Sequence, residues 1–166
     1  EKERADLVYD FIENGAISLH WVGPDGIILW ANQTELDQLG YARDEYIGHS
    51  ITEFHADQSI IGDILSRLSR NETLLDYEAR LRCKNGEVRT VLINSNVLWR
   101  DGKFVHTRCF TRDITDIKRQ ALATRESEAR YRSLIEQAND AIFVADAETG
   151  IIIEANKRAE ELLGRP

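Results

Sequence analysis

The chain contains a second copy of its own opening. Residues 11–41 read FIENGAISLHWVGPDGIILWANQTELDQLGY, and residues 134–165 read LIEQANDAIFVADAETGIIIEANKRAEELLGR. With one extra residue in the later turn, Thr149, the alignment pairs Gly26 with Gly150, Asn32 with Asn156 and Gly40 with Gly164. An offset near 124 residues is too long for a solenoid repeat and is typical of a whole domain. We therefore expect one complete domain, a connector and the first third of a second copy, as in a slice of a longer tandem array.

Composition limits the classes of partner. Hydrophobic residues make up 42% and charged residues 30% of the chain, as in an ordinary globular protein. The net charge of -8 argues against a nucleic-acid partner, which needs a basic surface. No apolar run approaches the ~20 residues that span a bilayer, so we expect no membrane contact. The two cysteines form no CxxC pair, which fits a reduced, cytoplasmic compartment and argues against a zinc site.

The first third of the chain predicts a hairpin between helices. Apolar periodicity and turn residues indicate a helix over 2–14, strands over 17–22 and 27–31, short helical turns over 44–58 and an amphipathic helix over 60–68. Between the second strand and the helical turns, Asn32 begins a short helix and Gly40 ends it. Glu35 stands three residues after Asn32, the spacing of a capping box.

Three strands follow, over 75–83, 88–99 and 104–112, joined by the hairpin signals Asn85-Gly86 and Asp101-Gly102. This order predicts an α+β protein with an antiparallel sheet. From Ile114 to about Ala138 the pattern is helical, with Asp113 as the expected N-cap. That helix is either a solvated linker or, as we favour, a parallel two-stranded connector between domains, because so polar a helix gains little stability alone.

These features together resemble a Per-Arnt-Sim (PAS) sensor domain. The resemblance rests on element order, on Asp25-Gly26 leading to Asn32, on Gly40-Tyr41, and on the TRDIT run at 111–115; it restarts at Leu134. It implies a five-stranded sheet in the order 2-1-5-4-3 with helices on one face, a pocket between them, and flanking signalling helices. The expected segments are a linker helix (1–14), a complete PAS domain (15–115), a connector helix (116–133) and a truncated second PAS domain (134–166).

The implied strand order separates the two cysteines. Cys83 would lie on the third strand and Cys109 on the fifth, with the fourth strand between them. Their backbones would then be roughly 10 Å apart, beyond the ~7 Å that a disulfide allows. We therefore expect two free thiols.

Strand alternation and the internal repeat nominate the residues that face the pocket. Alternation on the first three strands selects His20, Val22, Leu29, Tyr77 and Leu81, and analogy with flavin-binding PAS domains adds Ile93, Ser95, Thr107 and Cys109. The short helix adds Glu35 and Gln38, which align with the apolar Ala159 and Leu162 of the repeat. Buried polar groups are costly unless they are partnered. We hypothesise that His20, Glu35 and Gln38 bind a polar group of a small ligand; the alternative is that Glu35 only completes the capping box and stays in solvent.

The sequence does not identify a cofactor. Haem in PAS domains usually needs a histidine on the long helix, and residues 59–71 contain none; His55 precedes that helix and is expected to cap it. Covalent flavin or chromophore attachment needs a cysteine that residues 49–57 lack, whereas non-covalent flavin stays open. His49 and His55 have no third ligand nearby, so we expect no metal site.

The outer face of the sheet is expected to carry Phe104, His106, Arg108 and Phe110, and a face so apolar is costly to expose. The first helix, through Leu7, Val8, Phe11 and Ile12, either covers this face or forms a homodimer there. The truncated copy also needs support, because an isolated hairpin is only marginally stable. We therefore expect it to contact the first domain or another chain.

No catalytic set is present: the chain has neither a phosphate-binding glycine loop nor a nucleophile with a base. The resemblance implies a cytoplasmic sensory module of a multi-PAS signalling protein, foremost a histidine kinase of a two-component system. It would relay ligand or redox state through Asp113 and Thr115 into the connector helix. The alternatives are a ligand-free PAS domain used for dimerisation and spacing, and a regulator of a cyclic-dinucleotide enzyme.

Overall fold

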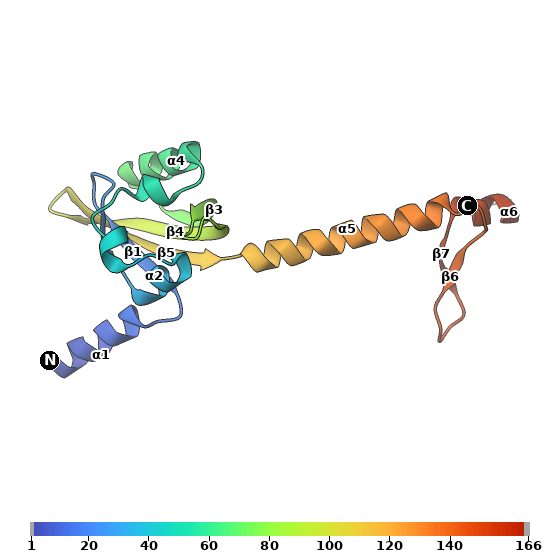
Figure 1. Cartoon of the computed structure of the whole chain (residues 1–166), viewed down its shortest axis with the longest axis horizontal. Helices are drawn as coiled ribbons and strands as arrows, with labels where there is room; N and C mark the ends of the chain where they lie inside the picture. The colour runs from blue at the N-terminus through green and yellow to red at the C-terminus, as the bar shows by residue number, and fades with distance from the viewer. Residues whose placement is uncertain (1, 165–166) are drawn as a thin grey trace. The chain divides into compact units, whose positions relative to one another are not determined.

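The computed structural model describes residues 2–164 and divides into two compact units that meet between Asp116 and Ile117 (Figure 1). Each unit is described by itself. The first unit contains α1 (Lys2–Glu13), β1 (Ser18–Val22), β2 (Ile28–Ala31), α2 (Gln33–Leu39), α3 (Arg43–Tyr46), a 3-10 helix (Ile51–Phe54), α4 (Gln58–Ser69), β3 (Leu74–Arg82), β4 (Val88–Arg100) and β5 (Lys103–Asp113).

The five strands form one antiparallel sheet in the order β2-β1-β5-β4-β3, which confirms the predicted fold class (Figure 1). Tyr46 of α3 and Ile61 of α4 share a single core cluster with the inward residues Val91 and Ile93 of β4. The helices between β2 and β3 therefore cover the same face of the sheet. Cys83, just after β3, and Cys109, on β5, are both free thiols as expected.

Asn32 ties the helices to the sheet. Its side chain is fully buried, and its Oδ1 accepts hydrogen bonds from the backbone N–H of Leu19 at 3.0 Å and of Glu35 at 3.1 Å. Its Nδ2 donates to the carbonyl oxygens of Ile12 at 3.0 Å and Ile17 at 2.9 Å. One side chain thus holds the end of α1, the start of β1 and the start of α2, and all four of its hydrogen-bonding positions are used.

Two bulges change the predicted facing of residues. Trp21 pairs with Trp30 but Val22 pairs with Ile28, so Leu29 is an extra residue on β2. Leu29 was predicted to face the pocket; it is instead 48% exposed. A second shift, between Leu98 and Trp99 of β4, places Phe104 against the core rather than on the outer face.

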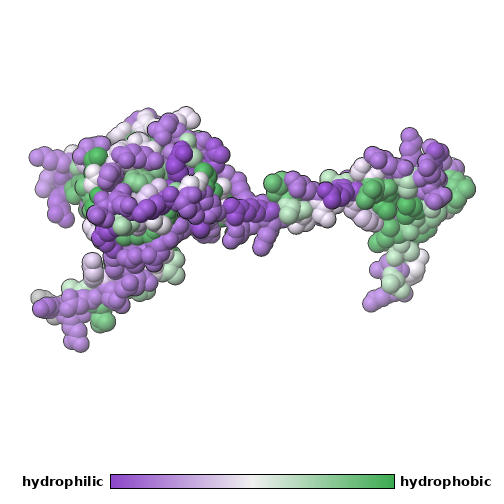
Figure 2. All heavy atoms as spheres, in the orientation of Figure 1, coloured by the Kyte–Doolittle hydropathy of each residue, from purple (hydrophilic) through white to green (hydrophobic). Residues whose placement is uncertain are grey.

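The second unit holds the rest of α5 (Thr115–Gln137), followed by β6 (Phe143–Ala145), β7 (Ile152–Ala155) and α6 (Lys157–Leu163). Asn156 repeats the arrangement at Asn32: its Oδ1 accepts from Ile142 and Ala159, and its Nδ2 donates to the carbonyl oxygens of Ile135 and Asp140. Figure 2 shows apolar surface over this hairpin unit, where Ile151 and Ile153 are 63% and 66% exposed. No helix in the described range 2–164 combines the length and hydropathy needed to cross a membrane.

We expect Asn32→Ala to lower the free energy of unfolding of the first unit by about 4 kcal/mol, because four hydrogen bonds are lost at roughly 1 kcal/mol each. Asn32→Asp keeps both acceptor contacts but buries a carboxylate oxygen against the carbonyl oxygens of Ile12 and Ile17, so it should be no more stable than the alanine variant. Urea denaturation followed by tryptophan fluorescence measures both. Equal stability of the alanine variant and the wild type would contradict the anchoring role.

Candidate functional site

The structure places most of the predicted pocket residues on the inner face of the sheet or on the helix above it. Tyr77 and Gln38 are half-buried, and Leu29 alone is exposed. The remaining nominated residues are buried: His20, Val22, Glu35, Leu81, Ile93, Ser95, Thr107 and Cys109. The interior is therefore unusually polar for a domain of this size.

Glu35 lies inside this interior and not at the solvent. Its side chain is 1% exposed, accepts a hydrogen bond from the Tyr46 hydroxyl at 2.9 Å, and has Oε1 3.1 Å from Nδ1 of His20. The capping box predicted here is only half formed: the Asn32 side chain accepts from the Glu35 N–H, while the Glu35 carboxylate turns into the core. The alternative of a solvated Glu35 is wrong.

His20 and Glu35 form a buried ion pair. Burial opposes the charge on His20, but the negative groups of Cys109 and Glu35 outweigh it and hold the pKa of His20 well above its ordinary value. Burial likewise opposes the charge on Glu35, and His20 overcomes it, so the pKa of Glu35 is lowered. Burial beside Glu35 raises the pKa of Tyr46, which therefore stays a hydrogen-bond donor.

Cys109 continues the cluster across the sheet. It is the cross-strand partner of His20, its thiol donates to Thr107 Oγ1 at 3.2 Å, and its Sγ lies 2.8 Å from Ser95 Oγ. Burial alone would raise the pKa of this thiol, but the neighbouring His20 lowers it overall. Cys83 shows the opposite direction, because burial raises the pKa of its thiol and Arg89 compensates only in part.

Several buried polar atoms have no hydrogen-bond partner. Those in or beside the cluster are Nε2 of Gln38, Nδ1 of His55 and Oγ1 of Thr111, whereas Nδ1 of His20 faces Glu35 Oε1 at 3.1 Å in the ion pair. The oxygen of the Gln38 amide is already used, since Ser18 Oγ donates to it. Buried polar atoms of this kind are normally satisfied by water or by a ligand.

A groove of about 520 Å³ adjoins this cluster. Ser18, Gln38, Thr111 and Asp113 are among the residues that line it. The groove therefore extends from polar residues of β1, α2 and β5 to Asp113 at the end of β5.

The end of β5 is bound to the start of α5. Asp113 Oδ1 accepts from the Thr115 N–H at 2.8 Å, Asp113 Oδ2 accepts from Arg89 at 2.7 Å, and Thr115 Oγ1 accepts from the Thr90 N–H at 2.9 Å. Burial opposes the charge on Asp113, and the contacts to Thr115 and Arg89 lower its pKa overall. The sequence predicted Asp113 as the N-cap of α5. Asp113 is instead the last residue of β5 and lies two residues before the first residue of α5.

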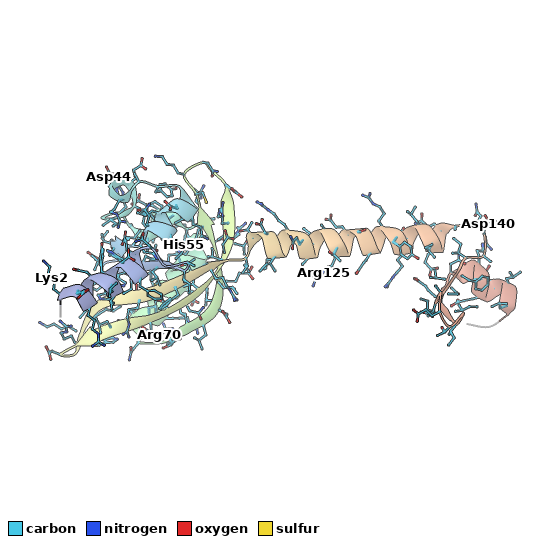
Figure 3. All side chains as sticks on the ribbon, turned by 90° about the horizontal axis from the view of Figure 1, so that it is seen from below. Lys2, Asp44, His55, Arg70, Arg125 and Asp140 are labelled. Carbon is cyan, nitrogen blue, oxygen red and sulfur yellow. The ribbon has the colours of Figure 1, made fainter. Side chains whose placement is uncertain are left out.

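Four residues of the cluster were not nominated from the sequence: Ser18, Tyr46, His55 and Thr111. Ser18 and Thr111 face inward, as alternation on the first strand and the analogy with flavin-binding PAS domains predict, but they were not nominated as site residues. Tyr46 ends a short helix and His55 directly follows another, where no period reveals which side chains turn inward. His55 was expected to cap the long helix; Asp57 occupies that position, and His55 is 3% exposed beside Leu81 (Figure 3).

Within residues 2–164, no group of three or more His, Cys, Asp or Glu side chains is arranged to hold a metal ion. The outer face carries Trp21, which stacks on His106 at 4.5 Å between ring centroids and packs on Trp30 at 4.8 Å. A second groove, of about 470 Å³, lies beside these rings and is lined in part by Phe11 and Ile12 of α1.

Comparisons with known proteins assign the family. A family model described as a PAS domain matches residues 15–116, and a second PAS domain model matches residues 129–166. The chain therefore belongs to the PAS domain family, whose members are sensory modules that are not themselves catalytic. No match was found among curated protein sequences.

Solved structures share this fold. The PAS domain of an HTR-like protein from Haloarcula marismortui is 25% identical with a TM-score of 0.60, over 68% of this chain and 93% of that one. A domain of a sensory box sensor histidine kinase/response regulator from Geobacter sulfurreducens is 21% identical with a TM-score of 0.57, over 66% and 94%. The light-state dimer of the fungal blue-light photoreceptor Vivid is 17% identical with a TM-score of 0.54, over 59% and 78%.

We expect His20→Gln to lower the free energy of unfolding by about 3 kcal/mol, because it leaves the buried Glu35 carboxylate without a counter-charge. The double variant His20→Gln, Glu35→Gln removes both charges and keeps an acceptor for Tyr46. Its loss should be smaller than the sum of the two single losses. Urea denaturation at pH 7 gives the coupling, and additive losses would show that the pair is not coupled.

Acid should destabilise the domain through His55. Burial, then the charge on His20, lowers the pKa of His55 to about 4, against an ordinary 6.5, although Glu35 and Asp57 oppose this. The unfolded chain therefore binds a proton that the folded chain refuses, and stability falls as pH drops from 6.5 to 4. The loss from this residue is about 3 kcal/mol, at 1.36 kcal/mol per pKa unit.

His55→Gln isolates this effect. His20, whose pKa is raised, is protonated in both states below pH 6.5, and the lowered pKa of Glu35 adds acid sensitivity in both proteins. The difference in unfolding free energy between variant and wild type, measured at pH 7, 6, 5 and 4, should therefore report His55 alone. Parallel curves would contradict the assignment.

Proposed function

We propose that this chain is the sensory segment of a multi-PAS signal-transduction protein. Residues 15–115 would form the ligand-responsive domain, residues 116–133 the connector, and residues 134–166 the start of a second PAS domain. A small polar molecule in the buried cluster would alter β5, and β5 would alter the start of α5. The observation that carries this proposal is that β5 bears Thr107, Cys109 and Thr111 in the cluster and Asp113 at the junction.

The groove of about 520 Å³ supports a ligand role, because its lining includes both Gln38 of the cluster and Asp113 of the junction. The unpartnered atoms of Gln38 and Thr111 favour a ligand with hydrogen-bonding groups over an apolar one. Non-covalent flavin stays an alternative occupant. Haem is disfavoured, since α4 carries no histidine.

The proposed output is a cytoplasmic histidine kinase of a two-component system. Support comes from the similar structure from Geobacter sulfurreducens, which is a domain of a sensory box sensor histidine kinase/response regulator. A cyclic-dinucleotide enzyme is the alternative output, because a fold shared by many proteins does not fix the reaction downstream.

We further propose that the chain forms a homodimer through α1 and the outer sheet face. Leu7 and Phe11 of α1 are 67% and 78% exposed, and the groove of about 470 Å³ places Phe11 beside Trp21 and Phe110. Exposed apolar surface of this kind marks association sites. A PAS domain that only dimerises and spaces its neighbours is the competing function, and it would need no ligand in the cluster.

The coupling is tested by hydrogen exchange at residues 113–120 of the whole chain. Perturbing the cluster with His20→Gln should change exchange there several-fold in the wild-type background and not in Asp113→Ala, which removes the contacts to Thr115 and Arg89. Asp113→Ala should itself cost about 1 kcal/mol of stability through the lost hydrogen bond from the Thr115 N–H. Asp6→Ala, an exposed carboxylate on α1, is the matched control.

Native mass spectrometry of the chain, incubated with the small-molecule fraction of a cell extract, tests occupancy in the same samples. A bound molecule that also changes exchange at residues 113–120 supports the sensory function. An apo mass together with unchanged exchange in His20→Gln would overturn it in favour of dimerisation and spacing.

A further inference from the structure

The two cysteines of this chain have opposite surroundings. Both are buried free thiols, but the groups beside them differ: Cys109 is the cross-strand partner of His20 on the buried face of the sheet. Cys83 instead lies beyond β3, donates to Gln38 O at 3.9 Å, and has Arg89 nearby, which offsets only part of the effect of burial on its pKa. The chain therefore carries its own internal comparison between a buried thiol beside histidine and a buried thiol beside arginine.

The histidine beside Cys109 is held by Glu35 through its Nδ1. Nδ1 of His20 is 3.1 Å from Glu35 Oε1, and the residue is 5% exposed. Glu35 holds the ring charged, while Ser95 and Thr107 surround the sulfur with hydroxyl groups at 2.8 and 3.2 Å. The Cys109 sulfur, the His20 ring and the hydroxyl groups of Ser95 and Thr107 thus lie together in the core.

We propose that Cys109 is a hydroperoxide-reactive thiol assisted by His20. The Cys109 sulfur attacks as the thiolate, having lost its proton to solvent; an S–O bond forms to one oxygen of the hydroperoxide and the O–O bond breaks. The sulfur is oxidised by two electrons to sulfenic acid, and the peroxide is reduced. The leaving hydroxide, or alkoxide, takes the proton of the His20 imidazolium and departs as water or alcohol.

Reaction at this position would change the cluster in two ways. One oxygen atom is added between β1 and β5, and His20 becomes neutral beside the Glu35 carboxylate. A buried carboxylate without a counter-charge is strongly destabilising, so the oxidised cluster would have to rearrange. Transmission of that change to α5 rests on the proposed function, whereas the reactivity of Cys109 does not.

The experiment treats the intact chain with hydrogen peroxide, traps sulfenic acid with dimedone and quantifies each cysteine by peptide mass spectrometry. We expect Cys109 to be labelled at least tenfold faster than Cys83. We also expect its rate to fall less between pH 8 and pH 6 than the rate of Cys83, because the pKa of Cys109 is lowered and that of Cys83 is raised. The charged and titratable groups around Cys109 are His20, Glu35, Tyr46 and His55. The lowered pKa of His55 keeps that residue neutral between pH 8 and pH 6.

Two variants separate assistance from mere burial. His20→Gln should slow labelling of Cys109 at least tenfold and leave Cys83 unchanged; His20→Gln with Glu35→Gln is the neutral counterpart that avoids an unpaired carboxylate. Circular dichroism confirms that each is folded. Labelling of Cys109 no faster than Cys83, or equally fast in the double variant, would overturn the proposal.

Hydrogen exchange at residues 113–120 of the oxidised chain separates this inference from the proposed function. Labelled Cys109 with unchanged exchange would sustain the reactivity and contradict the coupling to α5. Unlabelled Cys109 with exchange that still responds to His20→Gln would overturn the reactivity and sustain the coupling.

Discussion

One buried asparagine holds the domain together at the point where its layers meet. Asn32 uses two donor and two acceptor positions on four backbone groups, from α1, β1 and α2. A polar side chain can be fully buried only when it is fully satisfied, and here the satisfaction is itself the cross-link. Asn156 makes the same four bonds in the second unit. The repeat in the sequence therefore preserves an interaction rather than a hydrophobic pattern.

The position next to this anchor explains the polar interior. Because Asn32 fixes the start of α2, the helix presents the residues three and six positions on, Glu35 and Gln38, to the sheet. In the repeat the same positions hold Ala159 and Leu162, so an apolar contact is possible in this geometry. The first copy instead carries a carboxylate that requires His20 and Tyr46 as partners. Burying a charged group costs stability, and such departures from an apolar core are typical of functional sites.

Sequence patterns located the strands and the resemblance to PAS domains implied their order, but alternation failed where the backbone departs from it. His20, Ser95 and Cys109 face inward as a period of two requires. Leu29 faces outward and Phe104 faces the core, each contrary to its prediction, because bulges at Trp21/Val22 and Leu98/Trp99 shift one strand against its neighbour, and no residue in either strand signals them. Tyr46 and His55 were missed for a related reason: turns too short for a period do not reveal which side chain turns inward.

The strand β5 connects the polar cluster to the start of α5. Its inward residues Thr107, Cys109 and Thr111 belong to the polar cluster, and its last residue, Asp113, orients the first turn of α5. A change at the sulfur of Cys109 lies four residues from that carboxylate on a strand that is hydrogen-bonded on both sides. Strands paired on both edges are displaced as units rather than bent locally, since a local bend would break ladder hydrogen bonds. Under the proposed function, β5 would carry a displacement from the cluster to the helix, and the bulge at Leu98/Trp99 lies at the other end of β5 from Asp113.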